Sequence, residues 1–299
     1  MTEESQDTIF QTPDVAWDSS SQGSDTGSRH SSADSSAEPV RKSREEEEDG
    51  EIAALWCRYH GMAQASTRVR VTDADKKSYA QITAVLSSAA DDAKFTPEEH
   101  VYAHQVAAMA VAGLAEHHRS CFGSMAAVAL LIASEDRRGV SFKFTELLEM
   151  CEDGTTVDEL TRFYRVVRAY VARFPFSATS IDCASVLRDA FWMPETCFLM
   201  IKFILEAAAE TLDAFAFEPH VQAATATYLI RCFGRLPSAW DHNLECFTGL
   251  CEKDIQGCSE VILSSLRGLR ASSSDVAIRY SRTICGDVSG YVLEHAAAM

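Results

Sequence analysis

The amino-acid sequence predicts an all-α protein with two bundles of five helices in tandem, preceded by a disordered acidic tail and a lead-in helix. Three observations predict this class. From Glu51 onward apolar residues recur at helical spacing, and no stretch shows sustained apolar–polar alternation, so strands are not indicated. Residues 123–136 and 219–235 are apolar on almost every side, as expected of helices enclosed by other helices. Each is the third in a run of five predicted helices.

Residues 1–50 are expected to form the disordered tail. They hold thirteen acidic residues, four basic residues and eleven serines. Such a segment buries too little apolar surface to offset the entropy of ordering it. Acidic residues three positions after a serine, and a proline directly after Thr12, give the phosphorylation candidates Thr12, Ser31, Ser35 and Ser43. A solvated tail with unregulated serines is the alternative.

The first predicted run begins with a lead-in helix at 51–66, where Ile52, Leu55, Trp56 and Tyr59 share one face. The five helices that follow are expected at 73–92, 97–118, 123–136, 143–152 and 156–173.

The start at Pro97 has the clearest local signature of the first run. Thr96 takes the N-cap position, Pro97 takes the first helical position and Glu99 lies three residues after the cap. This pattern is a capping box with a proline where a helix tolerates one.

The second run is expected at 179–192, 194–216, 219–235, 239–250 and 253–270. Short connections between neighbouring helices are typical of compact bundles. The expected domains are therefore a tail at 1–50, a first bundle with the lead-in helix at 51–176, a second bundle at 177–291 and a short tail at 292–299.

Charge and hydropathy restrict the partners. The chain has a net charge of −17, and the longest apolar stretch, Met125 to Ala133, is about half the length that spans a bilayer. A membrane partner is not expected, and nucleic acid is disfavoured because phosphate binding draws on positive charge. Ten cysteines form no CxxC pair, which favours small buried thiols in a reducing compartment over zinc or redox sites. With no signal-peptide pattern at the start, we expect the nucleus or the cytoplasm.

Motifs for enzymatic chemistry are missing: the sequence has no GxGxxG, P-loop, HExxH or GxSxG motif. His100 and His104 lie four residues apart on one helical face but lack a third ligand, so they are interpreted as a surface pair rather than a metal site. The adjacent His117 and His118 diverge around the helix and are not expected to bind a metal together. Trp240 is expected to pack in the core. No enzyme activity, cofactor, metal or small-molecule substrate is therefore predicted.

Several segments together resemble the cyclin family. Residues 127–134, AVALLIAS, resemble the central helix of a cyclin box, and 156–167, followed by RFPFSATS at 173–180, are similar to its fifth helix and the turn after it. In the second run, AATATYLI at 223–230, the Trp, Leu, Thr-Gly and Asp-Ile positions between 240 and 258, and VAIRYS at 276–281 resemble the second cyclin lobe. The resemblance covers roughly residues 51–291.

This resemblance implies a non-catalytic regulatory subunit that binds a protein kinase of the cyclin-dependent class and acts in cell-cycle or other regulation. The implied kinase-contact residues are Ile132, Glu135, Asp136, Arg165, Phe174 and Phe176, with Trp56 bracing the edge. Cyclins carry a lysine after the serine of their IAS motif and a glutamate on the fifth helix. Here Glu135 takes the lysine position, and either Arg165 or Val167 takes the glutamate position, depending on which phenylalanine begins the turn.

Other functions stay open. The first helix of the box lacks the cyclin signature that supports substrate docking, so that docking function is not implied. A cyclin-fold scaffold for non-kinase partners is one alternative, since the charge at position 135 is reversed. A B-type transcription initiation factor shares the double fold, but it would need a basic surface and usually a zinc ribbon, and no cysteine precedes Cys57.

Overall fold

The computed structural model describes residues 50–59, 71–114, 121–152, 154–173, 178–269, 274–282 and 286–299. Within these ranges the chain folds into helices and no β-strand, as the sequence predicts. None of the helices in these ranges has the length and hydropathy needed to cross a bilayer. Nearly all of the predicted tail lies outside the described residues, and so do the phosphorylation candidates Thr12, Ser31, Ser35 and Ser43 and the pair His117 and His118.

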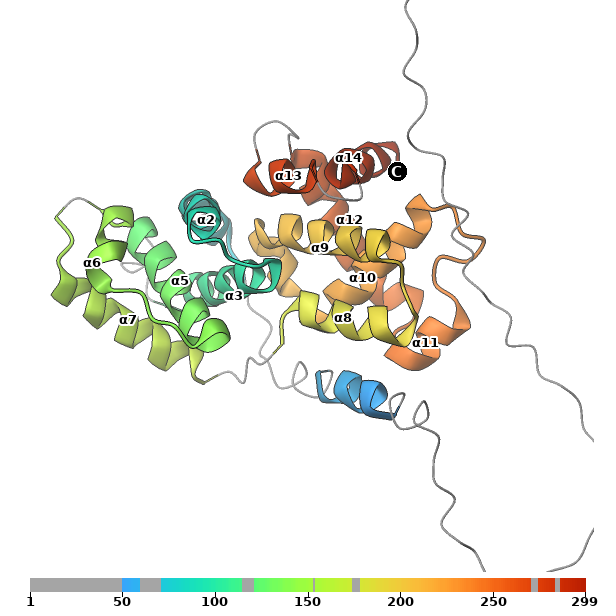
Figure 1. Cartoon of the computed structure of the whole chain (residues 1–299), viewed down its shortest axis with the longest axis horizontal. Helices are drawn as coiled ribbons and strands as arrows, with labels where there is room; N and C mark the ends of the chain where they lie inside the picture. The colour runs from blue at the N-terminus through green and yellow to red at the C-terminus, as the bar shows by residue number, and fades with distance from the viewer. Residues whose placement is uncertain are drawn as a thin grey trace, which may run out of the picture. The chain divides into compact units, whose positions relative to one another are not determined.

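The first bundle is built around α5 (Figure 1). Helix α5 packs against α2, α3 and α7, and its first turns also contact η1. The elements of this bundle are α2 (Asp73–Asp92), α3 (Pro97–Gly113), α5 (Phe122–Arg138), α6 (Phe144–Leu147), η1 (Leu148–Met150) and α7 (Val157–Val171).

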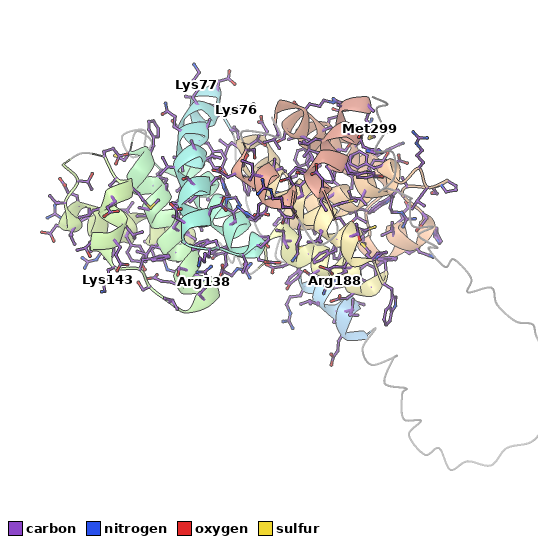
Figure 2. The ribbon with its side chains drawn as sticks, turned by 45° about the horizontal axis from the view of Figure 1, so that its top comes forward. Lys76, Lys77, Arg138, Lys143, Arg188 and Met299 are labelled. Atoms are coloured by element: carbon purple, nitrogen blue, oxygen red, sulfur yellow. The ribbon has the colours of Figure 1, made fainter. Side chains whose placement is uncertain are left out.

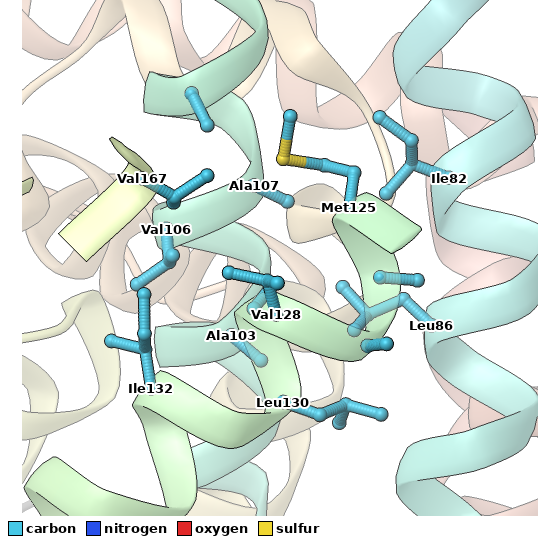
Figure 3. Packing of buried hydrophobic residues seen from close by; sticks show 14 of the residues in the cluster. Ile82, Leu86, Ala103, Val106, Ala107, Met125, Val128, Leu130, Ile132 and Val167 are labelled. Atoms are coloured by element: carbon cyan, nitrogen blue, oxygen red, sulfur yellow. The ribbon is translucent and has the colours of Figure 1, made fainter. Parts of the chain in front are cut away.

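Every residue of α5 from Gly123 to Ser134 is buried, which confirms the prediction that this helix is enclosed. Figure 3 shows how side chains of α2, α3 and α7 surround Val128 and its neighbours on α5. Small residues on α3, among them Ala103 and Ala107, let the two helices approach closely. Gly123 has the same role toward η1, because a Cβ on it would lie 2.0 Å from the carbonyl oxygen of Met150.

Helix starts follow the local signals. The capping box predicted at Thr96 is confirmed: the Glu99 backbone N–H donates to Thr96 Oγ1, and the Thr96 N–H donates back to Glu99 at 2.7 Å. The same reciprocal pair begins α2 at Thr72, α7 at Thr156 and the next bundle at Thr179.

The second bundle encloses α10 in the same way (Figure 1). Helix α10 packs against α8, α9 and α12 and is buried along nearly its whole length, as predicted. The elements of this bundle are α8 (Ser180–Ala190), α9 (Glu195–Ala209), η2 (Leu212–Ala216), α10 (Pro219–Phe233), α11 (His242–Thr248) and α12 (Glu252–Gly268).

Several predicted helices are shorter or interrupted. The segment 143–152 forms α6 and η1, and 239–250 shortens to α11 because Asp241 caps its start and Gly249 ends it in the left-handed conformation. The helix predicted at 194–216 breaks after Ala209. The amide of Gln222 donates to the carbonyls of Ala214 and Phe217, which satisfies backbone groups that the break frees.

Two helices were not predicted. The structure adds α13 (Asp275–Tyr280) and α14 (Val288–Ala298), so the prediction of a tail at 292–299 is wrong. Val292 and Ala296 of α14 are fully buried, and α14 packs on α9 and α12. These apolar contacts stabilise a C-terminal helix that has few local signals of its own.

The lead-in helix is seen at residues 50–59; the rest of its predicted range lies outside the described residues. Trp56 is 2% exposed and its Nε1 donates to the carbonyl of Thr248 at 3.3 Å. The indole ring also packs against the rings of Phe247 and His220. Trp56 therefore anchors the lead-in helix to the second bundle.

A buried polar network joins the two bundles around Glu206 of α9. The carboxylate is fully buried, lies 3.0 Å from Nδ1 of His100 and accepts a 2.6 Å hydrogen bond from Arg279 of α13. Arg279 also pairs with Asp91 at the end of α2. Although burial raises the pKa of Glu206, His100 and Arg279 more than offset it and hold that pKa below its usual value.

The prediction that His100 and His104 form a surface pair is wrong, because both are fully buried. Helix α3 packs against α2, α5, α7 and α9, so no face of its centre meets solvent. The His104 Nε2 lies 3.2 Å from that of His100, and Nδ1 lies 2.9 Å from the Tyr79 hydroxyl. Burial, together with the nearby His100 and Arg279, holds the pKa of His104 well below its usual value.

The contact of Gly123 with η1 gives a test of the first bundle. Gly123→Ala should lower the free energy of unfolding by about 1–3 kcal/mol, because backbone has to move to admit the methyl group. Gly268→Ala is the control, since nothing lies within 4 Å of its Cβ position. That variant should be neutral or more stable in urea denaturation. Equal stability of the two variants would contradict the close packing of α5 on η1.

His104 gives the protein a defined sensitivity to acid. The folded protein keeps His104 neutral, whereas the unfolded chain takes up a proton near pH 6.5, so stability falls as pH drops below about 6.5. Urea denaturation at about pH 7 and about pH 5.5 should show a loss of up to about 1.4 kcal/mol per pH unit from this group. His104→Asn should reduce that loss, whereas His242→Asn on the exposed face of α11 should leave it unchanged.

Candidate protein-docking surface

Four consecutive charged residues, Glu135 to Arg138, end α5 (here called the charged end of α5). They form the region where the sequence places the implied partner contacts. All four bond to other parts of the fold, Glu135 and Asp136 both to α7, so this end of α5 holds its neighbours in place.

Glu135 is bonded within the first bundle. Its carboxylate accepts hydrogen bonds from the Tyr164 hydroxyl of α7 at 2.7 Å and from the Ser141 hydroxyl at 2.9 Å. Burial and the adjacent Glu135 raise the pKa of Tyr164 to about 12. The reversed charge at position 135 is thus satisfied by hydroxyl donors of the same chain.

Asp136 forms a two-point ion pair between α5 and α7. Both of its oxygens accept from the Arg168 guanidinium at 2.6 Å, and the Tyr102 hydroxyl of α3 donates to it at 2.8 Å. Burial alone would raise the pKa of Asp136, but Arg168 and Tyr102 outweigh it and lower that pKa. Planar two-point pairs of this kind are stronger and more directional than a single ion contact.

The two arginines that follow link α5 to more distant elements. Arg137 pairs with Asp182, the capping-box residue of α8, and its guanidinium lies 5.0 Å from the ring centroid of Tyr102. Arg138 pairs with Glu99 at 2.6 Å and stacks over Phe95 at 4.6 Å. Figure 2 shows Arg138 at the opposite end of the first bundle from Lys76 and Lys77.

The outward face of α7, which we call the α7 face, consists of Arg162, Arg165, Val166 and Ala169. Their spacing places them on one side of the helix, and Val166 is 42% exposed. Leu160, Phe163 and Val167 on the other side are buried in the first bundle. The α7 face is basic and partly apolar, in a chain whose net charge is −17.

The structure brings only some of the predicted contact residues together. Glu135 and Asp136 lie at the charged end of α5, and Arg165 lies on the exposed α7 face. Glu135 bonds to Tyr164 rather than to Arg165, and the pair of opposite charges between the two helices is Asp136–Arg168. Phe174 and Phe176 lie outside the described residues.

Two predicted contact residues are buried. Ile132 has no exposed surface, because other helices enclose α5 at this position. The prediction that Ile132 contacts a partner is therefore wrong, and Ile132 belongs to the core. Trp56 is likewise covered by the second bundle. The lead-in helix still reaches this region through Tyr59, whose pKa is raised by burial and by the nearby Asp182.

The sequence patterns did not predict the roles of Tyr102, Tyr164, Arg168 and the Arg137–Asp182 pair. Each partner lies on a different helix, and the helix packing that joins them has no local signature.

The prediction that the cysteines are buried also needs correction. Among the described cysteines Cys183 and Cys258 are buried, whereas Cys57 and Cys246 are exposed. Among the described residues, no group of three or more histidine, cysteine or acidic side chains could hold a metal ion.

Comparison with known families decides the fold family. Residues 173–289, from the turn before α8 to the start of α14, match the family model of the cyclin C-terminal domain. This part of the chain is a cyclin C-terminal domain. No curated protein matches the chain significantly. The matched range contains the second bundle, and the first bundle with the charged end of α5 precedes it.

The Asp136–Arg168 pair can be tested by a double-mutant cycle. Asp136→Asn, Arg168→Gln and the double variant should give a coupling free energy of about 0.5–1 kcal/mol, because the pair is bidentate but partly exposed. The same cycle on the exposed neighbours Arg188 and Asp189 should give a coupling near zero. A coupling near zero at Asp136–Arg168 in urea denaturation would show that the pair does not hold α5 to α7.

Proposed function

We propose that this protein is a non-catalytic cyclin-like regulatory subunit that binds a protein kinase of the cyclin-dependent class and activates or targets it. The observation that carries the proposal is the cyclin C-terminal domain at 173–289, preceded by the first bundle with its enclosed central helix α5. Members of the family are generally regulators that act through protein contacts. We expect the protein in the nucleus or the cytoplasm, with a role in cell-cycle or related regulation.

The proposed contact surface is the α7 face together with the charged end of α5. Glu135 and Asp136 are bonded within the chain, so the groups left for a partner are the exposed arginines and Val166 of α7. A kinase segment that fits this face would carry acidic side chains beside an apolar one. The subunit would activate the kinase by binding its active arrangement more tightly than its inactive one. The size of the shift is limited by that difference in affinity.

A scaffold for non-kinase partners is the second candidate, and one observation favours it. Position 135 carries a negative charge where the family resemblance implies a lysine, and Tyr164 and Ser141 of the same chain satisfy that charge. A kinase surface that is complementary to a lysine there would meet a carboxylate. The α7 face would then serve a partner of different charge pattern.

Affinity purification of the full-length protein from cells, followed by mass spectrometry, tests the proposal. A protein kinase should be recovered in near-stoichiometric amount, and the Arg165→Glu, Val166→Asp double variant should reduce its recovery about tenfold or more, because it reverses a charge and removes an apolar contact on the α7 face.

Lys77→Glu makes the charge reversal of Arg165→Glu on α2, at the far end of the first bundle from Arg138 (Figure 2), so it should leave recovery unchanged. Stoichiometric recovery of other proteins without a kinase would instead support the scaffold. Loss of kinase with Lys77→Glu as well would show that net charge, rather than the α7 face, governs binding.

A further inference from the structure

The C-terminal domain contains a cavity of about 630 Å³ that no part of the proposed kinase contact uses. It opens between α10, the segment before α11, and α12. The side chains that give it chemical character are Tyr228, Trp240, Glu245, Glu252, Lys253 and Glu260. The cavity is large enough for a long side chain and the adjoining backbone of a bound peptide.

Two aromatic rings form a rigid wall of this cavity. The centroids of Tyr228 and Trp240 are 6.5 Å apart and the ring planes meet at 73°. Trp240 Nε1 donates to the carbonyl of Leu250 at 2.9 Å, which holds the indole in place. Trp240 was predicted to pack in the core, but both rings are only partly buried and line the cavity.

The carboxylates give the cavity a negative charge. Glu245, Glu252 and Glu260 are exposed at its edge, and Lys253 is the one basic residue among the described residues that line it. The Tyr228 hydroxyl donates to Glu252 at 3.0 Å, so one carboxylate is held directly beside the aromatic wall. Aromatic faces attract cations, and this attraction adds to that of neighbouring carboxylates.

We propose that this cavity binds an arginine side chain from an exposed segment of a partner protein. A guanidinium is planar and weakly hydrated, so it stacks on an aromatic face while its N–H groups donate to carboxylates on the edge of the same site. A quaternary ammonium has no hydrogen to donate to the three glutamates. A lysine ammonium is compact and strongly hydrated, and gains less from the aromatic wall.

The first test compares two peptides on the full-length protein. Acetyl-Ala-Arg-Ala-amide and the same peptide with citrulline, which has nearly the same shape without the charge, are titrated while the indole resonances are followed by NMR. The arginine peptide should shift the Trp240 indole N–H signal with saturation, and the citrulline peptide should bind at least about tenfold more weakly. Equal binding of the two peptides would overturn the proposal.

Charge-neutral variants then locate the site. Glu260→Gln and Glu252→Gln should each weaken binding of the arginine peptide about two- to fivefold, and Lys253→Ala should strengthen it by removing the competing cation. Glu294→Gln, an exposed glutamate on α14, is the matched control and should leave binding unchanged. Equal effects at Glu294 and Glu260 would show non-specific attraction by an acidic protein and overturn the proposal.

The site and the kinase contact can fail separately. The arginine cavity lies on α10 to α12, whereas the proposed kinase contact lies on α5 and α7. If the arginine peptide binds but no kinase is recovered, the proposal of an arginine site is supported and the proposed kinase function is contradicted. If a kinase is recovered but the arginine and citrulline peptides bind equally, the kinase function is supported and the arginine site is contradicted.

Discussion

Helices α5 and α10 are each surrounded by other helices along almost their whole length, and the rest of the fold follows from this enclosure. A helix that is apolar on every side loses a large amount of hydrophobic free energy if any face meets water. Alanine and glycine on the buried faces let neighbouring helices approach closely, as Gly123 does toward η1. Two such enclosed helices in one chain therefore require two bundles.

The bundles are joined by polar groups rather than by apolar contact alone. Glu206 is fully buried, and such a carboxylate is tolerated only with close partners. Arg279 and His100 supply them from α13 and α3, and Arg279 extends the network to Asp91 of α2. Groups from four helices thus form one network around this carboxylate, so α13 is part of the junction between the bundles.

Some charged groups at the surface are bonded within the chain, whereas others are exposed and free to contact a partner. The charged end of α5 is bonded internally, through Tyr164 to Glu135 and through Arg168 to Asp136. Two of the surfaces that stay exposed are the basic α7 face on the first bundle and the acidic, aromatic cavity beside Trp240 on the second. Surfaces of opposite charge on the two bundles are suited to partners, or segments of one partner, of different composition.

The sequence by itself determined the features that depend on neighbouring residues: the enclosed helices at 123–136 and 219–235, the capping box at Thr96, and the order of motifs that resembles cyclins. Contacts between distant residues were decided only by the tertiary structure. His100 is buried because Glu206 lies opposite it, and Trp56 is buried because its indole meets Thr248, 192 positions away. Hydrophobic periodicity and helix caps depend on residues a few positions apart in one helix. Ion pairs and pockets depend instead on which helices become neighbours, and this is decided only when all the enclosed faces pack together.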